Sequence, residues 1–236
     1  MILKAEFSKQ PVLESQTADS GVFTAEQMET IIRDRQFELL PPLMAEAVNK
    51  CIDAFTKTAD PQVIDLILDQ AHYGHSLMLA KKSKSPFLQK LLAITIDLIN
   101  LRVFLRMKLL KKQWEYTKNV LIPGGEIESS FYQTMLPVGF DDFIELDQVI
   151  PYGALLEDGI KMYKATGSLA GFEKMCDNYI MTYIKQYEFA AFGIEPLVAY
   201  LLAKETEIRN VRIIMVGKIN NIAKDVIRER LRDVYV

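Results

Sequence analysis

The feature that most constrains the fold of this chain is a patterned segment that occurs twice, at residues 86–108 and again at residues 196–218. The two copies align without a gap at a spacing of 110 residues, and seven of their 23 positions are identical. The identical pairs are Pro86/Pro196, Leu91/Leu201, Leu92/Leu202, Ala93/Ala203, Asn100/Asn210, Arg102/Arg212 and Lys108/Lys218. Asp97 is matched conservatively by Glu207. Self-similarity at a fixed spacing indicates a duplicated structural module.

The repeat extends beyond these two segments. Residues 150–152, Ile-Pro-Tyr, match Leu-Pro-Pro at 40–42 with the same spacing, and 173–177 match 65–69 with a two-residue deletion. The first seven residues, MILKAEF, resemble the end of the repeated segment, with Leu3 and Lys4 in the places of Leu105 and Arg106. The sequence therefore divides into residues 1–34, a remnant of a first module with a linker, 35–143, a second module, and 144–236, a third module.

Every long segment has the 3.6-residue periodicity of a helix, and no sustained two-residue alternation indicates a strand. Thr24 followed by Gln27 predicts a capped helix that runs to about residue 35. Further helices are expected at 42–58 and 62–82, and the segment 86–108 is apolar nearly all round, which is typical of a helix buried among other helices. Residues 123–125, Pro-Gly-Gly, predict a turn. The chain is predicted to be all-α.

Composition excludes several classes of protein. A net charge of -3 gives no general electrostatic footprint for nucleic acid. Cys51 and Cys176 lie far apart in no ligand-like spacing, which is typical of core residues in a reducing compartment. The most apolar runs are interrupted by charged and polar residues, so no membrane-spanning segment is expected, and the N-terminal residues lack the pattern of a signal peptide. The expected location is the cytoplasm.

Two groups of residues are candidates for chemistry. Asp69, His72 and His75 follow each other at three-residue steps on a predicted helix and could hold a zinc or iron ion, although the same residues could form a solvated helix face.

The second group lies within the duplicated segments and consists of Asp97, Asn100, Arg102, Glu207, Asn210 and Arg212. Polar groups inside an apolar helix must find hydrogen bonds, since burial without a partner costs about 1–3 kcal/mol per group. A catalytic pair is one interpretation. Their presence in both copies favours a repeated structural clamp that ties each helix to a neighbouring segment. No phosphate-binding loop or nucleophile motif is present, so neither nucleotide binding nor a catalytic residue is predicted.

The duplicated Pro…LLA…Asn-x-Arg segments, the Pro-Gly-Gly turn and the C-terminal residues 227–236, IRERLRDVYV, together resemble the C subunit of the V/A-type ATPases, the family of the eukaryotic V-ATPase d subunit. The resemblance implies three helical modules in a funnel with pseudo-threefold symmetry. It implies a non-catalytic central-stalk protein without cofactors, which contacts the D and F subunits of the shaft and the membrane proteolipid ring. Such a protein lies on the cytoplasmic side of the membrane and is held there peripherally through the ring.

The chain departs from this family pattern in its length. Most of the first module would be missing, either by truncation or through a misassigned start. An exposed apolar surface where that module should pack, and self-association, are then expected. Two alternatives stay open from the sequence: a helical-repeat adaptor that binds another protein, and a metal-dependent enzyme that uses Asp69, His72 and His75.

Overall fold

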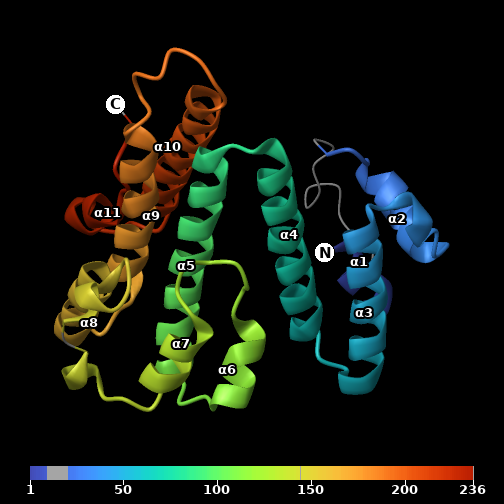
Figure 1. Cartoon of the computed structure of the whole chain (residues 1–236), viewed down its shortest axis with the longest axis horizontal. Coiled ribbons are helices and arrows are strands. Elements are labelled where there is room, and N and C mark those ends of the chain that lie inside the picture. The colour runs from blue at the N-terminus through green and yellow to red at the C-terminus, as the bar shows by residue number, and fades with distance from the viewer. Residues whose placement is uncertain (10–20, 144, 236) are drawn as a thin grey trace. The chain divides into compact units, whose positions relative to one another are not determined.

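The computed structural model describes residues 1–9, 21–143 and 145–235, and within these ranges it contains helices and no strand (Figure 1). This confirms the all-α prediction. The described residues form two compact units, Met1–Met78 and Leu79–Val236. The compact units and the sequence modules divide the chain at different places. The pseudo-threefold arrangement stays a prediction.

The first unit contains α1 (Ile2–Ser8), α2 (Ala25–Arg33), a 3-10 helix (Phe37–Leu39), α3 (Pro42–Thr58) and most of α4 (Gln62–Ser83). The predicted capping box begins α2: the Thr24 side chain accepts a hydrogen bond from the Gln27 amide, and the Gln27 side chain accepts one from the Thr24 amide. These bonds satisfy two donors that a helix start otherwise leaves open. The core of this unit gathers Leu3, Ile31, Ile32, Phe37, Leu40, Val48, Cys51 and Ile64.

Helix α1 is linked to α4 at positions that match those linking the end of α5 to α9 in the second unit. Leu3 and Ile64 belong to one buried cluster, and Lys4 Nζ lies 2.5 Å from Oδ2 of Asp65. At the repeat-equivalent positions, Leu105 and Phe172 share a buried cluster and Arg106 pairs with Glu173. The similarity of the first seven residues to the repeated segment is therefore accompanied by an equivalent ion pair and by equivalent places in a buried cluster.

The second unit contains α5 (Pro86–Leu109), α6 (Trp114–Val120), α7 (Ser129–Met135), two 3-10 helices (Phe140–Asp142 and Leu146–Gln148), α8 (Gly153–Thr166), α9 (Ala170–Lys185), α10 (Glu195–Ile219) and α11 (Lys224–Arg230). The two repeated segments are the long helices α5 and α10, and each has a proline in its first turn, where a missing amide donor has no consequence. The predicted turn at 123–125 lies between α6 and α7, where Gly124 has a φ of 109°.

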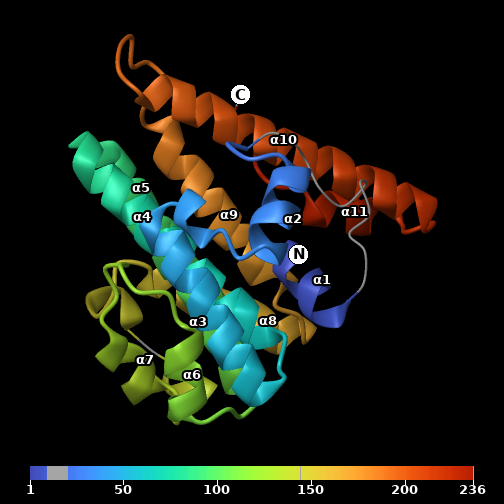
Figure 2. The ribbon, with the colours of Figure 1, turned by 90° about the vertical axis from the view of Figure 1, so that its right-hand side faces the viewer.

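Helix α9 is the centre of this unit, because it contacts α5, α8, α10 and α11 (Figure 2). Helix α5 is buried on most sides, as its sequence predicts. Near its N-terminus, the apolar side chains of α5 cluster with Met181 and Ile184 of α9. Toward its C-terminus, they cluster with Phe172 and Cys176. Burial raises the pKa of the Cys176 thiol to about 12, and that of Cys51 in the first unit to about 11.

Candidate functional site

The identical asparagines of α5 and α10 make the same pair of hydrogen bonds. Asn100 Nδ2 donates to the carbonyl of Ile122, and the Ile122 amide donates to Asn100 Oδ1, both at 2.8 Å. Asn210 Nδ2 donates to the carbonyl of Arg232, and the Arg232 amide donates to Asn210 Oδ1, both at 2.9 Å. In each case the partner lies 22 residues after the asparagine. The two repeated asparagines thus hold segments at equivalent positions of the repeat.

The segments held in this way follow the short helices α6 and α11. Each helix ends in a residue with extended backbone, Leu121 or Leu231, after which the chain passes over the long helix. An asparagine amide has one acceptor and one donor side, so it can pair with both the amide and the carbonyl of one extended residue. Without Asn100, the backbone amide and carbonyl of Ile122 would be buried without a hydrogen-bond partner. The geometry is that of a structural tie.

Asp97 makes a second tie in α5. Its carboxylate is fully buried and accepts hydrogen bonds from the amides of Glu126 and Ile127, at 2.8 and 3.1 Å. The preceding Gly125 lies so close that a Cβ atom there would stand 1.9 Å from Oδ1 of Asp97. Burial is the main cause that raises the pKa of Asp97, and it outweighs the two amide donors, which act in the opposite direction.

Glu207, the matched residue of α10, does not repeat this contact. Its side chain is exposed, and it pairs with Lys204 of its own helix at 2.6 Å. The Asp97 tie requires the turn that follows α6, and residues 233–235 after the Asn210 tie contain no glycine. The equivalence of the two acidic residues in sequence is therefore not an equivalence of contact.

Asp177 of α9 joins three arginines from different segments. Its carboxylate lies 3.3 Å from Nη1 of Arg102 in α5, 2.9 Å from Nη1 of Arg209 in α10 and 3.0 Å from Nε of Arg232 near the C-terminus. Only 10 % of the Asp177 side chain is exposed, so these ion pairs are screened less than surface pairs. Asp177 was not among the candidates predicted from sequence. Its only signal was its place at the end of the repeated stretch 173–177.

Arg212, the repeat partner of Arg102, has a different environment. It is exposed and lines an open cavity of about 430 Å³ between α9, α10 and α11. The charged residues of this cavity are Arg209, Arg212, Arg230, Arg232 and Glu173. Four guanidinium groups against one carboxylate make the cavity basic, although Arg209 and Arg232 also contact Asp177.

The candidate metal ligands lie on α4, where Asp69 and His72 are exposed and His75 is half-buried. Across the described ranges, no group of three or more histidine, cysteine, aspartate or glutamate side chains is arranged to hold a metal ion. Burial raises the pKa of the Asp69 carboxyl, and neighbouring Asp65 adds to this effect. Asp69, His72 and His75 are therefore placed along a helix and are not brought together around one point.

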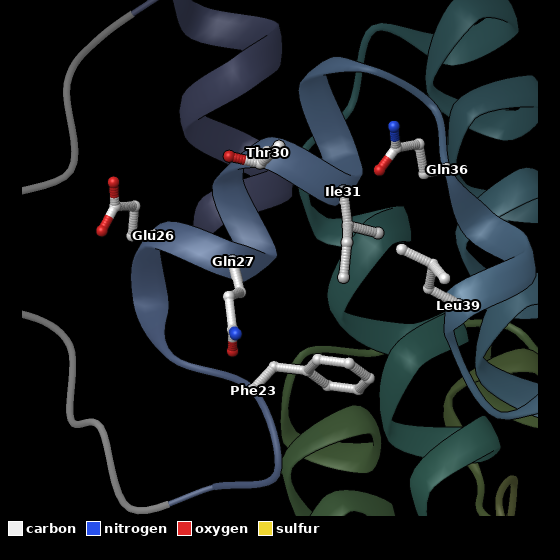
Figure 3. A pocket seen from close by; sticks show the side chains of 7 residues that line it. All are labelled: Phe23, Glu26, Gln27, Thr30, Ile31, Gln36 and Leu39. Atoms are coloured by element: carbon white, nitrogen blue, oxygen red, sulfur yellow. The ribbon is translucent and has the colours of Figure 1, made fainter.

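A second cavity, of about 330 Å³, lies in the first unit between α2 and the 3-10 helix at Phe37–Leu39. Figure 3 shows Phe23, Ile31 and Leu39 gathered on one side, with Glu26 standing apart from them. The remaining lining residues are Gln27, Thr30 and Gln36. The lining thus contains one carboxylate, two amides, one hydroxyl and apolar groups, and it contains no histidine, cysteine or lysine. This cavity supplies no set of catalytic groups.

Helix α10 has a long exposed apolar face, whereas the same face of α5 is covered. Six apolar side chains of α10 are between 53 and 73 % exposed: Leu197, Leu201, Ile208, Val211, Met215 and Ile219. The α5 residues that match the first five are at most 8 % exposed: Phe87, Leu91, Leu98, Leu101 and Leu105. Helix α10 therefore carries an exposed apolar surface, whereas the expectation from the sequence concerned the place where a first module would pack. Its relation to an earlier module stays a prediction.

The family model for the ATP synthase (C/AC39) subunit matches residues 1–230. The chain belongs to this family. No solved structure shows a significant match to it. The resemblance to the C subunit found in the sequence is confirmed at the level of this family, and the relation to the eukaryotic d subunit stays a prediction.

Several curated relatives of this C/AC39 chain are named as C subunits. It is 24 % identical to the C subunit of the V-type sodium ATPase of Enterococcus hirae over 235 residues, which cover 100 % of the chain and 71 % of the relative. It is 25 % identical to the C subunits of the A-type ATP synthases of Methanocaldococcus jannaschii and Pyrococcus abyssi. These matches cover 75 and 90 % of the chain and 46 and 59 % of the relatives. The C/AC39 chain therefore spans between about half and about 70 % of the length of these three relatives.

The described helices of this C/AC39 chain also bear on its relation to membranes. None of them is both long and apolar enough to cross a bilayer. Helix α5 has the length, but Asp97, Asn100 and Arg102 interrupt its apolar surface.

Proposed function

We propose that this chain acts as a non-catalytic central-stalk component of a V/A-type ATPase, which couples the rotating shaft to the membrane proteolipid ring during ion transport or ATP synthesis. The observation that carries the proposal is the match of the C/AC39 family model over residues 1–230. The curated relatives, named as C subunits of V-type and A-type enzymes, support it.

The contacts of the second unit suit a part that transmits force. A coupling element must keep its shape under load, and α5, α9, α10 and the C-terminal segment are joined through Asp177. Asn100 and Asn210 fix two further segments to the long helices. Partly buried ion pairs and paired amides hold segments in one arrangement because opening them leaves groups without partners. Asn100, Asn210 and Asp177 thus have a structural role in this proposal.

The partners that follow from this function are the D and F subunits of the shaft on one side and the proteolipid ring on the other. The chain is then a peripheral protein on the cytoplasmic side of the membrane, held there through the ring. It needs no cofactor and binds neither nucleotide nor nucleic acid.

The test is reconstitution with the D and F shaft proteins and the ring-bearing membranes of the same organism. We expect the tagged full chain to retain the D–F pair on an affinity column and to bind ring-bearing vesicles but not plain lipid vesicles. The isolated chain should hydrolyse no ATP. The E. hirae C subunit with its own D–F pair serves as the positive control.

Failure of the chain to bind either the D–F pair or the ring, under conditions in which the control binds both, would overturn the proposal. Turnover of ATP by the isolated chain would contradict its non-catalytic part.

A further inference from the structure

The exposed apolar face of α10 is spaced symmetrically about Ile208. Leu201 and Met215 lie seven residues to either side of Ile208, and Leu197 and Ile219 lie eleven residues to either side. Seven and eleven residues are close to two and three turns of an α-helix, so all five side chains lie on one face. Each of them is at least 53 % exposed.

This face has the residues of a packing surface and not those of a solvated one. In α5 the repeat-equivalent face is buried, and a second helix, α9, contacts it. Phe189 and Phe192, in the segment that precedes α10, are each 91 % exposed as well. A contiguous apolar strip of this length on the surface of a protein marks an interaction site.

A second copy of α10 in antiparallel orientation matches the spacing. A twofold axis at the height of Ile208, perpendicular to the helix, brings each Ile208 against that of the second copy. Met215 then lies at the height of Leu201 of the second copy, and Ile219 at the height of Leu197 of the second copy. Interfaces formed by a twofold axis use the same patch on both partners, so a face with this symmetry is complementary to itself.

The charges that flank the face fit the same arrangement. Glu205 and Arg212 lie about 60° and 40° to the same side of Ile208 on the helical wheel, three residues before it and four after it. The twofold rotation keeps each side chain on its own flank and reverses its height along the helix. Arg212 therefore meets Glu205 of the second copy, and the pair occurs twice. In a parallel twofold arrangement, the charges of the two copies would lie on opposite flanks and would not meet.

Both charged groups are available for this contact. Glu205 and Arg212 are exposed, and neither makes an ion pair with another residue in the described part of the chain. Pairs of opposite charge at the rim of an apolar interface select the orientation of the partners.

We propose that the α10 face is the interface of a homodimer, in which two copies of this chain pair α10 antiparallel about Ile208. The proposal does not rest on the function proposed above, because it uses only the side chains of α10 and its repeat relation to α5.

The mass of the full chain in solution, measured by light scattering and by sedimentation, gives the first test. We expect a dimer, with twice the chain mass of 27.0 kDa. Ile208→Glu should yield a monomer with an unchanged circular dichroism spectrum. Leu110→Glu, at an exposed apolar residue outside α10, should leave the dimer intact.

Charge reversal separates this interface from general hydrophobic association. Arg212→Glu and Glu205→Arg should each weaken the dimer at least about tenfold, since each places like charges opposite each other twice. The double variant Arg212→Glu/Glu205→Arg restores opposite charges and should recover the dimer.

Cross-linking locates the axis. Ile208→Cys should give a disulfide-linked dimer with a thiol oxidant, whereas Leu110→Cys should not, and both native cysteines are fully buried. A monomeric chain, including one in which residues of its own first unit cover α10, would overturn the proposal. So would a dimer that survives Ile208→Glu, or a double charge variant that is no tighter than the single ones.

Discussion

The Asn100 tie predicts a specific loss of stability when its side chain is removed. Asn100 is 4 % exposed and its partner Ile122 is 7 % exposed, so Asn100→Ala leaves one amide and one carbonyl buried without partners. Each such group costs about 1–3 kcal/mol, and we expect a total loss of about 2–4 kcal/mol because the smaller side chain lets the segment relax in part. The second tie is only partly buried, so Asn210→Ala should cost less, about 1–2 kcal/mol.

Urea unfolding followed by tryptophan fluorescence measures both losses in the unit that contains them. Trp114 is the only tryptophan, and it packs against the core cluster of the second unit. Asn220→Ala is the matched control, because Asn220 lies in the same unit, is exposed and donates to the Val216 carbonyl four residues earlier in the chain, and it should change stability by under about 0.5 kcal/mol. A loss below about 0.5 kcal/mol for Asn100→Ala, or a larger loss for Asn210→Ala, would refute the reasoning.

Three further expectations concern other contacts. Gly125→Ala brings a Cβ atom against the Asp97 carboxylate and should cost about 2–3 kcal/mol in urea unfolding; an unchanged stability would contradict this close contact. In the first unit, Leu3→Ala should cost about 2–4 kcal/mol, whereas Lys4→Ala breaks an exposed ion pair and should cost under about 1 kcal/mol, both measured by urea unfolding followed by circular dichroism. Both buried thiols should resist iodoacetamide at pH 8 in the native chain and react fully in denaturant, because their raised pKa keeps them protonated; fast native alkylation would count against their burial.

The helices could be predicted because their signals are local. A capping pair, a first-turn proline and a 3.6-residue apolar pattern act within a few residues of each other, so Thr24 and Gln27 mark the start of α2 from sequence alone. The segment 86–108 likewise became α5, Pro86–Leu109, with a shift of one residue at its end. Such signals therefore specify a helix without reference to the segments that pack on it.

The contacts of the polar residues could be predicted only in part. Buried asparagines in an apolar helix require partners, and this follows from desolvation. That the partners are Ile122 and Arg232 depends on how the segments after α6 and α11 return, which no local pattern specifies. The sequence pairs Asp97 with Glu207, yet their environments differ because burial of a helix face is decided by what packs on it. The same reason explains why α5 and α10 have the same apolar sequence pattern, although the matching side chains are buried in α5 and exposed in α10.

The packing of α5 against α9 has a consequence for how this chain folds. By sequence, α5 lies within residues 35–143, but its apolar face completes the core of residues 144–236, and Arg102 reaches Asp177 there. Cutting the chain between these two modules would leave residues 144–236 without one wall of their core. The residues of one repeat are therefore not expected to fold autonomously, and α5 and α9 should unfold in one cooperative step.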